Sequence, residues 1–226
     1  MKTNGTAFKP GLRTAFTALV LTLAVVWGCG GGGGPAAPIV LDTPEAYTAR
    51  GWERFEAGNF SDALADFDAA LGLAAQHGPA LTGRAWVLLV QATSQARMQE
   101  ALAVFAAAIA AGEDGGDALA GKACARLGAG DRPAAASDAA AALAAAPGFV
   151  FAHRTSFNST DLLLIVAVAK ATDGDFAGAL AAADLIAASG IDAGTSATWV
   201  VGGVTYPTFA GAVLARLQTL SDAHAG

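Results

Sequence analysis

The chain has 226 residues, 54% of them hydrophobic and 14% charged, a length that allows one domain or a compact array with a buried core. Its 13 Lys and Arg residues against 19 Asp and Glu give a net charge of −6, so the basic surface that binds nucleic acid is missing and we expect no nucleic-acid partner. Its two cysteines, Cys29 and Cys124, belong to no Cys-x-x-Cys motif or His/Cys cluster, which argues against a disulfide framework and a structural zinc site.

Residues 1–28 have the layout of a secretory signal peptide. Three basic residues, Lys2, Lys9 and Arg13, and no acidic one precede an apolar stretch from Ala15 to Trp27. A small residue, Gly28, follows this stretch. The stretch is shorter than the roughly 20 apolar residues that a membrane span needs. We therefore predict that this segment is a cleaved signal, with a short tilted span as the alternative.

The end of this segment, Val26-Trp27-Gly28-Cys29, resembles the lipobox of bacterial lipoproteins, although the lipobox prefers a smaller or aliphatic residue where Trp27 stands. The resemblance implies that Cys29 becomes the mature N-terminus and carries a diacylglyceryl thioether and an N-acyl chain such as palmitate. Several acyl chains give stable membrane attachment, whereas one chain alone is marginal. A free or disulfide-bonded Cys29 is the alternative.

Residues 29–42 read as a tether between this lipid and the folded part. Five glycines, Gly30 to Gly34, and a Pro-Ala-Ala-Pro run cannot form a packed element. Ten basic and nineteen acidic residues remain after residue 28, a net charge of −9, so the lipid rather than charge must hold the protein at an anionic membrane. By analogy with lipoproteins, Gly30 instead of Asp favours the outer membrane of a bacterial envelope, with the protein facing the periplasm.

A repeated template occupies residues 43–190. "GNFSDALADFDAAL" from Gly58 and "GDFAGALAAADLIA" from Gly174 share a Gly, an aromatic residue two positions later and an Ala-Leu pair, and weaker copies begin at Ala96 and Gly130. A second pattern relates Ala80–Trp86 to Ala118–Cys124 at a spacing of 38 residues. Alanine favours helices, so the sequence predicts pairs of helices, with the second pattern in first (A) helices and the template in second (B) helices.

These residues resemble the tetratricopeptide repeat, a helix–turn–helix unit of about 34 residues. The first copy supplies its small and aromatic positions at Gly51, Gly58, Phe60, Ala63, Phe67 and Ala70, and the last copy supplies Gly174, Asp175, Phe176 and Ala179. The resemblance implies an all-α solenoid of about four units with a capping helix. An Ala-rich bundle that matches the pattern by chance is the alternative.

Two stretches break the pattern. Residues 148–160 are aromatic and polar and predict an extended connector. The helix that starts near Asp161 has the apolar sequence "DLLLIVAVAK", so we expect it to be the best buried helix of the array. Residues 191–226 predict an irregular segment followed by an amphipathic capping helix from Pro207 to Leu220.

The sequence offers no catalytic, cofactor-binding or metal-binding constellation, so we expect a protein that is not an enzyme. Its three histidines, His77, His153 and His224, lie far apart without a paired carboxylate motif. Cys124 lies among apolar helical residues, as expected of a buried structural thiol.

Tetratricopeptide arrays bind peptides or proteins along a concave face of A helices, which implies a protein-interaction scaffold. The candidate partner-binding residues on that face are Trp52, Phe55, Arg84 and Trp86, and a second candidate surface is the connector with Phe151, His153 and Arg154. Interhelix packing is the other explanation for the aromatic residues. The alternative function is a lipoprotein that binds a small ligand or glycan for envelope transport or wall remodelling.

Overall fold

The computed structural model describes residues 42–113 and 115–225. The predicted signal peptide, the lipid-modified Cys29 and the tether up to residue 41 lie outside the described residues. Within the described part, no helix is long and apolar enough to cross a membrane.

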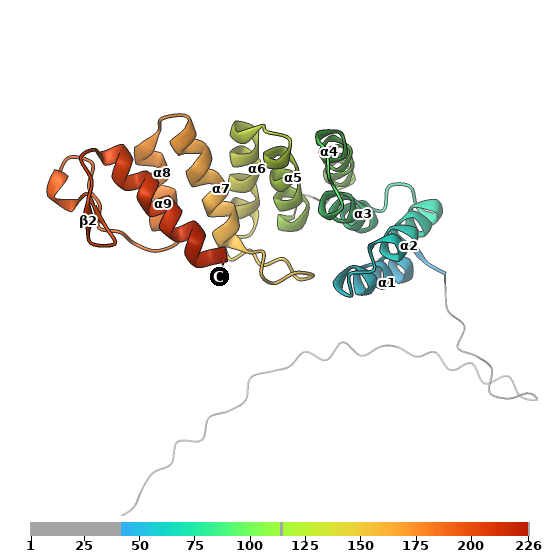
Figure 1. Cartoon of the computed structure of the whole chain (residues 1–226). Coiled ribbons are helices and arrows are strands. Elements are labelled where there is room, and N and C mark those ends of the chain that lie inside the picture. The colour runs from blue at the N-terminus through green and yellow to red at the C-terminus, as the bar shows by residue number, and fades with distance from the viewer. Residues whose placement is uncertain (1–41, 114, 226) are drawn as a thin grey trace, which may run out of the picture. The chain divides into compact units, whose positions relative to one another are not determined.

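Nine α-helices make up most of the described residues, and the first eight form four consecutive pairs (Figure 1). Each A helix packs on the B helix that follows it, and α1, α3 and α5 also contact one another in turn. The predicted all-α array of four helix pairs with a terminal helix is thereby confirmed. The helices are α1 (Pro44–Glu56), α2 (Phe60–Leu73), α3 (Gly78–Val90), α4 (Gln95–Ala110), α5 (Gly116–Gly128), α6 (Arg132–Ala145), α7 (Ser159–Thr172), α8 (Phe176–Asp184) and α9 (Phe209–Ala225).

The Gly at the start of the template makes the turn between an A and a B helix. Gly58 and Gly174 have φ of +77° and +82°, a left-handed conformation that favours glycine. In the last copy the next residue, Asp175, caps α8, because its Oδ1 accepts a hydrogen bond of 2.8 Å from the Gly178 N–H. The Gly-Asp sequence therefore ends one helix and begins the next.

The aromatic position inside the template fills the space between A helices. Phe67 of α2 is fully buried with its ring against Gly51 of α1 and Gly83 of α3. A Cβ at Gly51 would lie 2.7 Å from the ring, and a Cβ at Gly83 would overlap it. Phe105 of α4 takes the corresponding place against Gly121 of α5. Glycine in the A helices is thus the packing partner of a phenylalanine in the B helices.

Two ion-pair clamps join A to B helices in the first and third units. Arg50 and Arg54 of α1 reach Asp66 of α2 at 2.6 and 2.8 Å. Lys122 and Arg126 of α5 reach Asp138 of α6 at 3.1 and 3.0 Å, and all three residues of this clamp lie 72 positions after those of the first. Both Asp residues are buried, so each clamp also supplies the opposite charges that a buried carboxylate requires.

The helix expected to be the best buried is not. α7 contributes five buried residues, whereas α3 contributes eight. Val168 of α7 is 42% exposed because α7 borders a shallow apolar recess, shared with Leu214 and Leu217 of α9, that no helix of the described part fills. α3 instead lies inside the array, with α1, α2, α4 and α5 packed around it.

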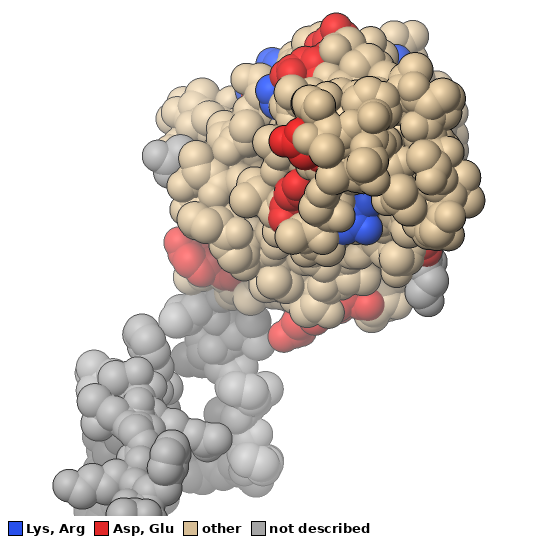
Figure 2. Space-filling view, turned by 90° about the vertical axis from the view of Figure 1, so that its left-hand side faces the viewer, with Lys and Arg blue, Asp and Glu red and all other residues tan. Residues whose placement is uncertain are grey.

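The segment after α8 reverses the chain before the last helix. It holds a short 3₁₀ turn, Ser196–Thr198, and a two-stranded ribbon in which β1 (Val200–Val201) pairs antiparallel with β2 (Val204–Thr205). α9 then runs back along α7, so that His224 Nε2 lies 2.9 Å from Asp161 Oδ1 at the start of α7 (Figure 1). Charged side chains are sparse on this end of the array (Figure 2), where residues 185–215 contain one charged residue, Asp192.

Candidate functional site

The structure brings five of the seven candidate partner-binding residues into one aromatic cluster. Residues of the connector lie against the surface of α1, α3 and α5, which we call the A-helix face. Phe55, Trp86 and Phe151 are buried there, and Trp52 and His153 are partly buried. The two surfaces that the sequence offered as alternatives, the A helices and the connector, are therefore the two halves of one contact.

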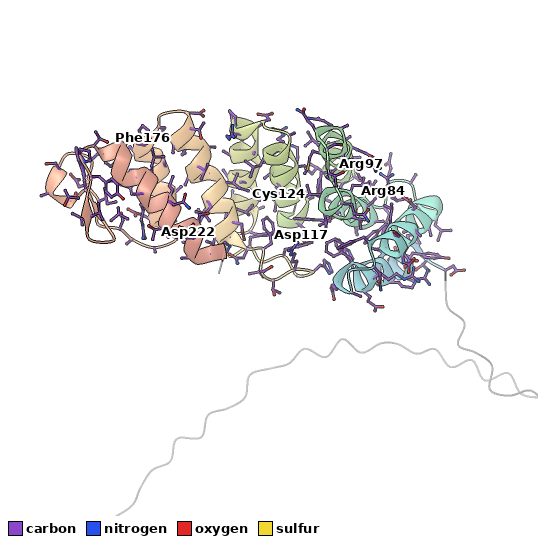
Figure 3. The ribbon with its side chains drawn as sticks, viewed as in Figure 1. Arg84, Arg97, Asp117, Cys124, Phe176 and Asp222 are labelled. Atoms are coloured by element: carbon purple, nitrogen blue, oxygen red, sulfur yellow. The ribbon has the colours of Figure 1, made fainter. Side chains whose placement is uncertain are left out.

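The other two candidates lie apart from this cluster. Arg84 Nε donates a 2.8 Å hydrogen bond to Asp68 Oδ1, which ties α3 to the preceding B helix (Figure 3). Arg154 is exposed at the tip of the connector. Neither residue contributes to the aromatic cluster.

Alternate residues of the connector contact successive A helices. Phe149 lies against Gly116 of α5, where a Cβ would come within 2.8 Å of the Phe149 ring. Phe151 stacks on Trp86 of α3, with ring centroids 4.2 Å apart and an interplanar angle of 20°. His153 stacks on Trp52 of α1, with centroids 3.8 Å apart and an angle of 2°. Phe149 and Phe151 flank Val150, which pairs with Asn158, and His153 follows in a turn where the Arg154 N–H donates to the Phe151 carbonyl at 3.0 Å. Positions 149, 151 and 153 together form a ladder across three helices.

The two tryptophans occupy equivalent positions of their repeats. Trp86 ends the Ala80–Trp86 pattern, whose counterpart 38 residues later ends at Cys124, and Trp52 occupies the corresponding place in α1. A solenoid presents such positions side by side, and here the first two of them carry flat aromatic rings. The sequence signal for the ladder was present in the alternation of Phe149, Phe151 and His153, which is typical of an extended segment with one buried side.

The connector is closed at its base and held at its tip. The Phe151 N–H donates to the Phe157 carbonyl at 3.0 Å, and the Ser159 N–H donates to the Phe149 carbonyl at 2.8 Å. Asn158 then begins α7 through a capping box with Asp161. At the tip, His153 Nδ1 lies 2.7 Å from Glu56 Oε1 of α1. The connector is thus a hairpin-like loop that reaches back across the A helices of three repeats.

Acidic groups surround the imidazole of His153. Glu56 pairs with it directly. Asp117, at the start of α5 beside the connector (Figure 3), has its pKa raised above the ordinary value by burial, and the charge of nearby His153 acts in the opposite direction. The Asp117 carbonyl also accepts a 3.2 Å hydrogen bond from Trp86 Nε1. The Glu56 carboxylate and the face of Trp52 are both complementary to a positively charged group at this position.

The described residues show no group of three or more His, Cys, Asp or Glu side chains that could hold a metal ion. Contrary to the sequence analysis, which found no paired carboxylate for the histidines, His153 and His224 each pair with one, Glu56 and Asp161. These partners come from distant helices, which sequence spacing does not show.

Burial raises the pKa of the Cys124 thiol to about 12, and the negative charge of Asp161 adds to the effect. The thiolate is the reactive form, so at pH 8 its population is about a thousandfold below that of an ordinary cysteine. In a Cys29→Ala variant, Cys124 is the one thiol of the chain, and we expect a chromogenic disulfide reagent to label it several hundredfold more slowly than glutathione. In urea the two rates converge. Labelling of the folded protein at the glutathione rate contradicts this account of Cys124.

No protein-family model matches the sequence, and no curated protein matches it either. Solved structures do match. YrrB, described as a tetratricopeptide-repeat protein with an unusual peptide-binding site, is 20% identical, with a TM-score of 0.56 over 80% of this chain and 87% of YrrB. MamA from Desulfovibrio magneticus is 18% identical, with a TM-score of 0.51 over 65% of this chain and 75% of its own. A tetratricopeptide-repeat protein from Parabacteroides merdae is 14% identical, with a TM-score of 0.51 over 80% of this chain and 60% of that protein.

At these identities the likeness shows the fold, which is the tetratricopeptide solenoid that the sequence pattern predicted. The binding site named for YrrB is a property of that protein.

Proposed function

We propose that the protein is a protein-interaction scaffold held by an N-terminal lipid in the envelope of a bacterium, where its A-helix face binds an extended segment of a partner protein. The fold supports the scaffold, since solenoids of helix pairs present long surfaces to other chains. The anchor and the location rest on the sequence of residues 1–29 alone, above all on the lipobox-like Val26–Cys29.

One observation carries the binding role: three alternate residues of the connector already lie on three successive A helices. The face is therefore shaped to take side chains of one non-helical segment on successive repeats. The alternative, a small-ligand or glycan site, needs an open space between stacked aromatic rings, and here Phe151 fills that space with its fully buried ring.

The proposal is tested by crosslinking in native membranes. The tagged protein and its Cys29→Ala variant, expressed at equal levels, are crosslinked, solubilised and recovered. We expect the wild type in the membrane fraction with one partner in near-stoichiometric amount, and the variant in the soluble fraction without it. Recovery of the wild type alone after efficient crosslinking contradicts the scaffold, and equal membrane association of the variant contradicts the lipid anchor.

A further inference from the structure

We propose that the connector is an internal ligand of the A-helix face, and that the partner segment carries the same order of side chains: two aromatic residues and then a histidine or other cation, at alternate positions. This inference rests on the proposed function, because it names what the scaffold binds. The segment that competes with the connector for the A-helix face belongs to another protein.

The chemistry of each position in the ladder defines the ligand. At the first position Gly116 leaves room for a ring, since any side chain there would collide with Phe149. At the second, Phe151 stacks on Trp86 and meets Trp52 and Phe55 edge to face, with centroids 5.9 and 6.3 Å away. Such geometry selects a flat aromatic group over a branched aliphatic one.

The third position selects a cation. His153 lies flat on Trp52, with ring centroids 3.8 Å apart, and its Nδ1 lies 2.7 Å from Glu56 Oε1. A protonated imidazole, a guanidinium or an ammonium group gains from the Glu56 carboxylate and from the ring face. An acidic side chain in this place would face the like charge of Glu56.

The connector can leave the A-helix face without losing its own backbone bonds. Within the described residues, the backbone hydrogen bonds of residues 148–158 all run to positions between 146 and 162. It is therefore held to α1, α3 and α5 by side chains, and an outside segment with the same side chains replaces each contact that the connector gives up. A tethered ligand acts at an effective concentration of about millimolar, so only a segment presented at high local concentration, or with tighter contacts, displaces it.

The test supplies the connector sequence in trans. A fluorescent peptide with the sequence of residues 148–157 is titrated against the full chain and against its Phe151→Ala/His153→Ala variant, whose second and third ladder positions are empty. We expect the variant to bind the peptide at least tenfold more tightly than the wild type does. The matched control peptide carries the same two alanine substitutions, and we expect it not to bind.

Circular dichroism shows whether the variant keeps its helices, and if it does not, His153→Ala alone, which removes a partly buried ring, takes its place. A folded variant that does not bind the peptide overturns the inference. Concentration-dependent dimers of the wild type that disappear in the variant also overturn it, because the second occupant is then another copy of this chain. The assay contains neither membrane nor partner, so its failure leaves the crosslinking result of the proposed function standing.

Discussion

Replacing Gly83 by valine is expected to lower the free energy of unfolding by about 2–3 kcal/mol. The backbone at Gly83 lies so close to the Phe67 ring that a Cβ there would overlap it, and Gly51 of α1 also lies against this ring. The ring is fully buried, so the added atoms force a shift of α3 against α2. Overpacking of a well-packed core costs about 1–3 kcal/mol. Urea denaturation followed by circular dichroism measures the loss.

Gly72→Ala is the matched control. Gly72 also lies in a helix, but it is exposed and a Cβ there meets nothing within 4 Å. Alanine is a better helix former than glycine by about 1 kcal/mol, so this variant should be as stable as the wild type or slightly more stable. If Gly83→Val proved as stable as Gly72→Ala, the packing of Phe67 between two A helices would be wrong.

Phe151→Ala is expected to lower the free energy of unfolding by about 3 kcal/mol, although Phe151 belongs to no helix. Its ring is fully buried and contacts the rings of Trp86, Trp52 and Phe55. Loss of a buried phenylalanine costs about 3–5 kcal/mol, and the hairpin-like loop can relax to recover part of it. We also expect the tryptophan fluorescence to shift to longer wavelength, because Trp86 and Trp52 lose the ring that covers them.

Val150→Ala, one residue away, separates this effect from a general weakness of the connector. The Val150 side chain points outward and is 53% exposed, so its loss should change stability by less than about 0.5 kcal/mol and leave the fluorescence unchanged. Equal effects of the two substitutions would mean that the connector does not present alternate sides to the A-helix face and to solvent.

Local signals made the repeat predictable from sequence. Gly174 turns the chain, Asp175 caps the next helix, and the small residues of the template let helices approach, so each short-range rule agrees with the packing that follows. The ion-pair clamps were also recoverable, since Arg50, Arg54 and Asp66 recur 72 positions later as Lys122, Arg126 and Asp138.

Long-range placement was not predictable. The apolar sequence of α7 suggested a fully buried helix, yet its burial depends on what packs over Val168, and the reversed α9 leaves that side partly open. In the same way, the sequence showed the aromatic residues of the connector and of the A helices but not that they meet. His153 and Glu56 are 97 positions apart, and no local pattern records such a contact.

Occupation of the A-helix face by the chain's own connector is the central claim, and proton–proton contacts in solution test it most directly. With the aromatic resonances of the protein assigned, nuclear Overhauser effects report pairs of ring protons closer than about 5 Å, a distance that both stacked and edge-to-face neighbouring rings reach. The account predicts strong effects between His153 and Trp52 and between Phe151 and Trp86, whose centroids lie 3.8 and 4.2 Å apart. If both pairs gave no effect while Trp86 and Phe105, 5.7 Å apart within the helical core, still did, the connector would lie off the face and the account would be contradicted.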